Sequence, residues 1–351
     1  MRYKFCEQLK NCIFFDSSCV VHCCNCGHDR DTIIIDDYKG EKIDWKKLIK
    51  DKLKIQENAK KGIIPYNSCK NCYMWREDVW NEGGYISEII ISSWTTCNCN
   101  CFYCYTAADK DFYNNFKTYD IYRVLKDFQK SKLINFKKDN GGIVRLLGGD
   151  VGTLKDFDKI VNLFLEEGAE HFYIPTSAVK YLPIVEKVLK EGKAEVIVSP
   201  DSSNRELYKK IKRIDAYEQV KQNMKKYANA AANTKSTFIS KFIIIPYIND
   251  SKEEIDNWLK ECKEIGVTNV AYDIEDNFTI KFSQKIPKKI PELFDYLERR
   301  GKEENMKVTR FRFAYQLLFD LENGTAKYSE NESDFIEQKK FMEKFRKEYC
   351  L

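Results

Sequence analysis

The chain of 351 residues is 43% hydrophobic and 32% charged, which is the composition of a globular protein rather than of a disordered or fibrous one. Its net charge of +5 is small, and Lys and Glu are mixed along the chain, so we expect no nucleic-acid partner. No apolar run reaches the ~18 residues of a membrane span, and the N-terminus lacks the apolar core of a signal peptide, so we expect a cytoplasmic protein without a membrane partner.

The first 87 residues hold eight of the 14 cysteines and are expected to form a Cys-rich module. In a reducing compartment these thiols are not expected to form disulfides, which leaves metal, cluster, catalytic or core roles. The segment 12–15 is predicted to be a strand, followed by a turn and a second strand that ends at Cys23. Zinc would use two C-x2-C pairs, and the alternative is an iron–sulfur cluster. The two zinc pairs are Cys23 with Cys26 and Cys69 with Cys72.

Six short apolar segments between residues 87 and 276 predict strands that are covered on both faces. They are 87–94, 141–150, 171–178, 194–202, 236–250 and 268–276. Helical stripes separate them, and glycines are placed to end three of these helices, at 168, 192 and 266. We therefore expect an α/β fold, with a partial (βα)6, TIM-like barrel over 88–285. Residues 286–351 are charged and are predicted to form a mostly helical C-terminal extension.

The stretch TTCNCNCFYCYT, residues 95–106, lies in the first βα loop, at the end of a barrel where active sites occur. Three of its cysteines have the spacing C-x3-C-x2-C, namely Cys97, Cys101 and Cys104. Three thiolates bind three irons of a [4Fe–4S] cluster and leave the fourth iron open to a ligand. Cys99 lies off this spacing and is interpreted as a small loop residue.

This motif, with an aromatic residue before its last cysteine and after the first strand of the series, resembles the radical S-adenosylmethionine (radical SAM) superfamily. The resemblance covers the motif and the strand series, about 190 residues. The end of the second strand, LLGGD, looks like the glycine-rich element that binds the methionine amino group in that family. The positions matched by the resemblance are Gly148, Gly149 and Asp150, the last in place of the usual Glu.

The resemblance implies further cofactor contacts at two other places. Ser199 and Asp201, after the fourth strand, match polar positions near the methionine carboxylate or the ribose, and Tyr103 matches a residue that contacts adenine. The implied chemistry is reductive cleavage of S-adenosylmethionine by the open-iron cluster. The resulting 5′-deoxyadenosyl radical abstracts hydrogen from an unactivated C–H of the substrate.

The N-terminal module is similar to the SPASM/Twitch auxiliary-cluster extensions of many radical SAM enzymes. That likeness implies a second [4Fe–4S] cluster, which assists electron transfer, with zinc as the alternative. Its ligands would be Cys6, Cys23, Cys69 and Cys72. The sequence departs from the pattern in three respects: Ser18 replaces the turn glycine, Asp78 replaces a further cysteine, and the module precedes the barrel.

The expected function is that of a radical SAM enzyme of the oxidoreductase or epimerase type. Its partners are expected to be S-adenosylmethionine, a small-molecule, sugar or short peptide substrate, and a one-electron reductant such as flavodoxin or ferredoxin. Two alternatives stay open: a ribosomal-peptide maturase that epimerises or cross-links its substrate, and a non-catalytic, zinc-stabilised binding protein. Cys262 lies on the apolar stripe of the helix 251–266 and is predicted to be a core residue.

Overall fold

The structure is a computed structural model, and it describes residues 3–16, 19–21, 34–37, 43–65, 69–70, 76–78, 84–104, 119–139, 141–275, 285–329, 335–338 and 340. The chain forms two compact units. Unit 1 comprises Met1–Thr96 and Asp111–Pro175, and unit 2 comprises Cys97–Lys110 and Thr176–Leu351. None of the helices in the described ranges is both long enough and apolar enough to span a membrane.

Unit 1 is built on parallel strands whose neighbours are joined by helices. Four of them pair in the order β2, β6, β7, β8, and these strands are Cys12–Phe15, Glu88–Ile91, Ile143–Leu146 and His171–Thr176. Strand β3 (Cys19–Val21) pairs antiparallel with β2, and β4 (Ile34–Asp37) pairs antiparallel with β3. The β2–β3 pair confirms the two predicted N-terminal strands, whereas residues 17–18 of the predicted turn and the predicted strand end at Cys23 lie outside the described residues. The parallel β2–β6 pair makes these strands part of the same sheet as β6. A separate antiparallel pair joins β1 (Tyr3–Phe5) to β5 (Arg76–Asp78).

The helices of unit 1 include two that the sequence did not indicate, the first two of the chain. They are α1 (Glu7–Asn11), α2 (Trp45–Lys60), α5 (Ile121–Lys130) and α6 (Phe157–Glu166), with short 3-10 turns at Phe136–Asp139 and Val151–Thr153. The buried face of α2 contains Lys52 and Gln56, which donate to the carbonyls of Leu9 and Lys10 at 3.1 and 3.3 Å. Because two polar residues interrupt its apolar stripe, the periodicity of α2 is weak in the sequence.

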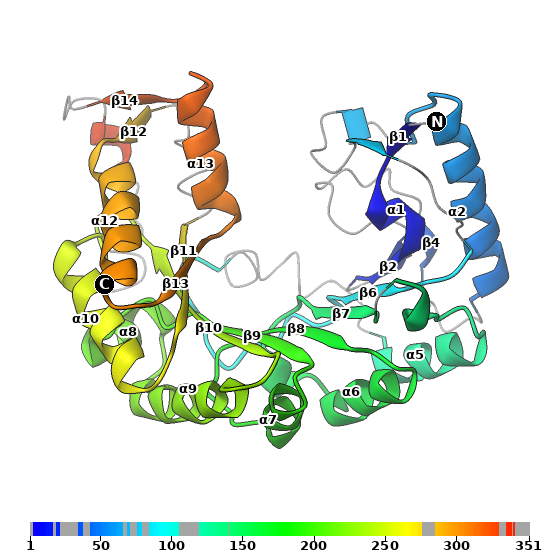
Figure 1. The fold of residues 1–351 in the computed structure, drawn as a ribbon, viewed down its shortest axis with the longest axis horizontal. Helices are drawn as coiled ribbons and strands as arrows, with labels where there is room; N and C mark the ends of the chain where they lie inside the picture. The colour runs from blue at the N-terminus through cyan, green and yellow to red at the C-terminus, as the bar shows by residue number, and fades with distance from the viewer. Residues whose placement is uncertain are drawn as a thin grey trace. The chain divides into compact units, whose positions relative to one another are not determined.

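Unit 2 continues the same plan with four more parallel strands. They pair in the order β9, β10, β11, β13, and they are Ala194–Val198, Thr237–Ile244, Asn269–Ile274 and Lys307–Arg310. Its helices are α7 (Pro183–Lys190), α8 (Arg205–Lys212), α9 (Tyr217–Ala231), α10 (Lys252–Glu264), α12 (Lys289–Glu303) and α13 (Arg312–Glu322). Short strands β12 (Lys285–Pro287) and β14 (Lys327–Ser329) form a separate parallel pair. Helices α7 and α9 lie on the same side of β9 and β10 (Figure 1).

The six predicted strands are all present, as β6 to β11, each a little shorter than its apolar segment. Gly168, Gly192 and Gly266 have φ of +86°, +74° and +81°, the left-handed geometry that ends a helix, as predicted. Strand β13 was missed, because it lies in the segment expected to be mostly helical. Its four residues are partly or fully exposed, so the sequence there contains no apolar run.

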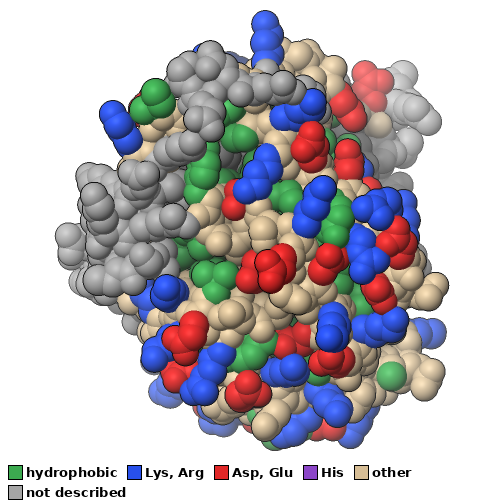
Figure 2. All heavy atoms as spheres, turned by 90° about the vertical axis from the view of Figure 1, so that its left-hand side faces the viewer, with side chains coloured by type: hydrophobic (Ala, Val, Ile, Leu, Met, Phe, Trp, Pro, Cys, Tyr) green, Lys and Arg blue, Asp and Glu red, His purple; other side chains and the backbone are tan. Residues whose placement is uncertain are grey.

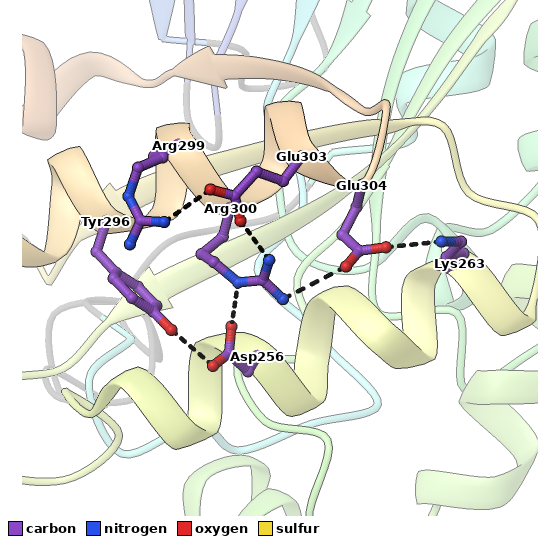
Figure 3. Close-up of polar contacts among 7 residues, drawn as sticks. All are labelled: Asp256, Lys263, Tyr296, Arg299, Arg300, Glu303 and Glu304. Atoms are coloured by element: carbon purple, nitrogen blue, oxygen red, sulfur yellow. Dashed lines mark hydrogen bonds and ion pairs between the residues drawn. The ribbon is translucent and has the colours of Figure 1, made fainter.

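Helices α10 and α12 are joined by a network of charged side chains (Figure 3). The guanidinium of Arg300 is central: it pairs with Asp256 at 2.9 Å across the two helices and with Glu303 and Glu304 on its own helix. Tyr296 also donates to Asp256, at 2.6 Å. Figure 2 shows that basic and acidic side chains are interspersed over the coloured part of the surface. Three contacts of the network join α12 and its C-cap to α10, namely Tyr296 and Arg300 with Asp256 and Glu304 with Lys263, and each exposed pair of this kind is weak.

Candidate functional site

The cysteine loop of unit 2 is fixed to the end of helix α8 through its backbone. The amide of Asn100 donates to the carbonyl of Lys212 at 3.0 Å, and the amide of Phe102 donates to the carbonyl of Ile211 at 3.3 Å. The Phe102 ring is 2% exposed and packs in a small apolar cluster with Ile211 and Ile245. Although the loop has no regular secondary structure, two of its backbone amides and one aromatic ring are held by the protein.

The four thiols of this loop lie at or near the surface. Cys97 is exposed, and Cys99, Cys101 and Cys104 are partly exposed. A turn in which the Cys104 amide donates to the Cys101 carbonyl at 3.1 Å brings these two residues together. The Cys99 thiol forms hydrogen bonds with the side chains of both Cys97 and Cys101. The structure therefore places Cys99 between two of the predicted ligands.

Hydrogen bonding separates the acidities of these thiols. The bond with Cys99, and after it the charge of Lys212, lower the pKa of Cys101 to about 7, against the opposing effect of burial. The same hydrogen bonds and burial raise the pKa of Cys99 well above its ordinary range. Cys101 thus has the character of a ligand thiolate, and Cys99 that of a neutral donor.

Soft thiolate donors on one short loop are the ligands that an iron–sulfur cluster takes, so the chemistry of Cys97, Cys101 and Cys104 fits a [4Fe–4S] cluster. Among the described residues, no three Cys, His, Asp or Glu side chains are placed to hold one metal ion. A cluster binds each of its cysteines through a different iron, so its ligands need not converge on a single point.

The cysteine loop contributes Tyr103 to a cluster with two buried residues, Asp201 and Lys212. The Asp201 carboxylate is fully buried; one oxygen accepts from both the Tyr103 hydroxyl and the Lys212 ammonium, and the other accepts from the Ile243 amide at 3.0 Å. Lys212 also donates to the Tyr103 hydroxyl at 2.8 Å. Burial, and then the negative charge of Asp201, raise the pKa of Tyr103, so that the phenol stays protonated and acts as a donor.

This cluster unites two residues that the resemblance assigned to separate cofactor contacts. The Tyr103 hydroxyl and the Asp201 carboxylate bind each other, and the carboxylate is engaged by three donors of the protein itself. Contacts of Tyr103 with adenine, and of Asp201 with methionine or ribose, stay predictions. Lys212 was not identified from the sequence, because the run KKIKR places it among exposed basic residues. Ser199 follows β9 directly and is partly exposed.

The Gly-Gly-Asp element of unit 1 packs tightly on the backbone that leads toward the cysteine motif. The Gly149 amide donates to the Trp94 carbonyl at 2.8 Å, and the Asp150 amide donates to the Thr96 carbonyl at 2.9 Å. A Cβ on Gly149 would lie 1.9 Å from the Thr96 carbonyl oxygen, and one on Gly148 would lie 2.5 Å from the Trp94 carbonyl oxygen. Glycine is therefore required at both positions by the neighbouring backbone, whatever ligand is bound.

The carboxylate of Asp150 has a local structural role. Its Oδ1 accepts from the Gly152 amide at 2.7 Å and so caps the 3-10 turn Val151–Thr153. The Asp150 carbonyl accepts from the indole of Trp94 at 3.1 Å. Asp150 thus closes the turn after β7, and the assignment of its side chain to the cofactor stays a prediction.

The predicted ligands of the auxiliary cluster are only partly described. Cys6 and Cys69 are buried in unit 1, each 3% exposed. Cys23 and Cys72 lie outside the described residues. The second cluster, its zinc alternative and the SPASM/Twitch resemblance therefore stay predictions. Cys262, predicted to be a core residue, is buried at 1% exposure, as expected.

Comparison with known proteins gives a consistent result. Residues 91–262 match the model of the Radical SAM superfamily. Over 185 residues the chain is 25% identical to a protein named Probable GTP 3',8-cyclase of Methanocaldococcus jannaschii, covering 52% of this chain and 57% of that protein. Over 191 residues it is 26% identical to the GTP 3',8-cyclase of Clostridium botulinum (strain Okra / Type B1), covering 53% of this chain and 56% of that protein.

A likeness of fold extends further along the chain. The crystal structure of Streptococcus suis SuiB matches 80% of this chain and 59% of its own, with a TM-score of 0.50 and 15% sequence identity. At that identity the match supports the fold alone, and it agrees with the predicted open, partial (βα)6 barrel. The family match, which includes the cysteine motif and the strands that follow it, shows a radical SAM domain over residues 91–262, about half of the chain.

Proposed function

We propose that the protein cleaves S-adenosylmethionine reductively and uses the resulting 5′-deoxyadenosyl radical to abstract hydrogen from a C–H bond of its substrate. The observation that carries this proposal is the cysteine loop. Its thiols have the C-x3-C-x2-C spacing, and its backbone is fixed to the end of α8 at Asn100 and Phe102. The family match supports the need for a [4Fe–4S] cluster and S-adenosylmethionine as cofactors.

In this proposal Cys97, Cys101 and Cys104 hold the cluster, and Cys99 stays protonated beside it. A bound cluster supplies the electron that breaks the C–S bond of S-adenosylmethionine. The protein's own contribution is to hold the three thiols on a fixed loop and to keep the phenol of Tyr103 protonated. A small electron-transfer protein such as flavodoxin or ferredoxin is the proposed source of the electron.

The turn after β7 supports the assignment of Gly148 and Gly149 to the methionine amino group. In the part of the chain that the structure describes, neither glycine carbonyl accepts a hydrogen bond from the protein. By contrast, the Gly149 amide donates to the Trp94 carbonyl, and a Cβ on either glycine would meet the Trp94–Thr96 backbone. Two carbonyls without protein donors are suitable acceptors for an ammonium group.

We propose a small molecule as the substrate, ahead of a sugar or a short peptide. The support is the name of two sequence relatives, GTP 3',8-cyclase, at 25% and 26% identity. The chain spans only 56–57% of the length of those relatives, so their substrate is an initial candidate for assay. The SuiB likeness, at 15% identity, favours no substrate class.

The decisive experiment uses single cysteine variants of the anaerobically reconstituted protein. Iron and sulfide are measured first, and about four irons per chain support one cluster, whereas about eight support the proposed auxiliary cluster as well. The protein is then incubated with dithionite and S-adenosylmethionine, with and without GTP, and 5′-deoxyadenosine is measured. Zinc analysis of the same sample tests the zinc alternative for the N-terminal module.

The loop supplies its own matched control. Cys97→Ala, Cys101→Ala and Cys104→Ala should each abolish 5′-deoxyadenosine formation, whereas Cys99→Ala, in the same loop, should retain it together with the iron content of the wild type. Formation of 5′-deoxyadenosine by the triple variant of Cys97, Cys101 and Cys104 would sink the proposal. An increase of 5′-deoxyadenosine on addition of GTP would support the substrate class.

A further inference from the structure

Lys212, the last residue of α8, is a buried cation in contact with the cysteine loop. Its side chain is 6% exposed, whereas that of Lys209 on the same helix is 52% exposed. Its ammonium donates to Asp201 and to Tyr103, and it lies 5.2 Å from the centroid of the Tyr103 ring. Removing a charge from water costs several kcal/mol, so a lysine is buried in this way only where such partners compensate it.

The backbone of the same turn holds the residues on both sides of Cys101. Asn100 and Phe102 donate their amides to the carbonyls of Lys212 and Ile211, at 3.0 and 3.3 Å. Tyr103, the next residue, is bound by the Lys212 side chain. The last turn of α8 therefore contacts three of the four residues that lie within two positions of Cys101 in the chain.

The charge of Lys212 acts on the same loop residues around Cys101. The last carbonyls of a helix carry partial negative charge, which disfavours a further anion close to them. The Lys212 ammonium offsets this field at the loop, since it donates to the hydroxyl of Tyr103 at 2.8 Å and Tyr103 lies between Cys101 and Cys104 in the chain. Asp201 is needed as well, because it keeps the ammonium in place inside the protein.

We propose that Lys212 is a positioning residue that fixes Cys101 through Tyr103 and Asp201 and that its charge raises the reduction potential of a cluster bound at Cys97, Cys101 and Cys104. This inference rests on the function proposed above. Reduction adds one negative charge to the cluster, and a fixed cation beside a ligand sulfur stabilises that added charge. The pair with Asp201 keeps the cation in position whether or not the cluster is reduced.

The test measures the cluster itself, without S-adenosylmethionine and without turnover. Lys212→Met keeps the length of the side chain and removes the charge, and Lys210→Met makes the same change at an exposed position of the same helix. Each protein is reconstituted anaerobically. The reduction potential is then determined by a titration followed by electron paramagnetic resonance, and iron release to a chelator is timed.

For Lys212→Met we expect the one-electron reduction equilibrium to move at least tenfold toward the oxidised state, which is ~59 mV. Iron should be released several-fold faster, because Tyr103, two residues from Cys101, has lost its hydrogen bond with the Lys212 side chain while the backbone contacts of Asn100 and Phe102 remain. Lys210→Met should match the wild type in both measurements. A potential and an iron-release rate for Lys212→Met equal to those of the wild type would overturn the inference.

A second variant covers the case in which the unpaired Asp201 prevents folding. The double variant Asp201→Asn/Lys212→Met leaves no buried charge, and it should still show the negative shift, although smaller. Wild-type potential in a folded double variant would also overturn the inference. If the wild type binds no cluster at all, the function proposed above fails; if it binds one and the variants are unchanged, only the role of Lys212 fails.

Discussion

The side-chain amide of Asn249 donates to the main-chain carbonyl of Asp201 at 2.8 Å and so ties the loop after β10 to the loop after β9. Asp201 has φ of +60°, a left-handed geometry that costs a non-glycine residue roughly 1–2 kcal/mol. A second pair in unit 2 has the same form: the Asn223 amide donates to the carbonyl of Ala178, φ +55°, at 2.8 Å. At two strand ends, a buried asparagine holds the backbone in an unfavourable conformation.

Replacing Asn249 by Ala should destabilise the protein by about 2–5 kcal/mol. The side chain is fully buried and makes three hydrogen bonds: two from its amide, to the carbonyls of Asp201 and Ile243, and one accepted from the Ile245 amide at 2.6 Å. Each buried partner left unsatisfied costs ~1–3 kcal/mol. Urea unfolding measures the change, with Asn257→Ala, an exposed asparagine of α10, as the control. Equal effects of the two substitutions would contradict this account.

Replacing Gly149 by Ala should destabilise the protein by about 3 kcal/mol or more. The new Cβ would lie 1.9 Å from the Thr96 carbonyl oxygen, an atom held in place by the Asp150 amide and the Thr153 hydroxyl. Overpacking against a fixed backbone atom cannot be relieved by a rotamer change. Gly168→Ala is the comparison, since its Cβ would meet no atom within 4 Å and its cost would come only from the φ of +86°. Its expected cost is ~1 kcal/mol, and a thermal or urea unfolding series ranks the two.

The buried carboxylate of Asp273 should make stability depend on pH. Burial raises its pKa above the ordinary value of 3.8, despite Lys241 and three backbone amides that favour the charged form. A raised pKa means that the folded state holds the proton more tightly than the unfolded state, so this group's contribution to stability falls as pH rises from about 4 through its folded pKa.

Asp273→Asn tests this dependence with little change of shape. The backbone amides of Ile274, Phe313 and Ala314 all donate to Oδ1, an acceptor that asparagine retains. Relative to the wild type, the variant should gain stability as pH rises from 4 to 7, measured by urea unfolding at several pH values. Parallel profiles for the two proteins would show that Asp273 does not titrate in this range.

The thiol of Cys262 should resist alkylation in the folded protein, whereas that of Cys97 should react. Burial raises the pKa of Cys262 to about 12, and only the thiolate is nucleophilic, so almost none of it is reactive near pH 8. Cys97 is exposed. Iodoacetamide labelling of the metal-free protein, followed by mass spectrometry, compares the two sites. Labelling of Cys262 before urea is added, at the rate of Cys97, would refute the prediction.

Much of the fold was predictable because its signals are local. Each of the strands β6 to β11 is a short apolar run, and the glycines at 168, 192 and 266 end helices by their own conformational freedom. Where the signal was not local, prediction failed. Helix α2 buries Lys52 and Gln56 against the carbonyls of Leu9 and Lys10, which are more than forty residues away along the chain. Strand β13 is recognised only by its pairing with β11.

The sequence by itself determined which cysteines are predicted to bind a cluster, because C-x3-C-x2-C is a spacing within a single loop and needs no tertiary contact to be recognised. Tertiary structure decided what surrounds them. Lys212 lies 109 residues from Tyr103 and is indistinguishable in sequence from the exposed lysines beside it. Only the packing of α8 against the loop removes its ammonium from water, pairs it with Asp201, and makes one ordinary lysine a fixed charge in contact with Tyr103 of the cysteine loop.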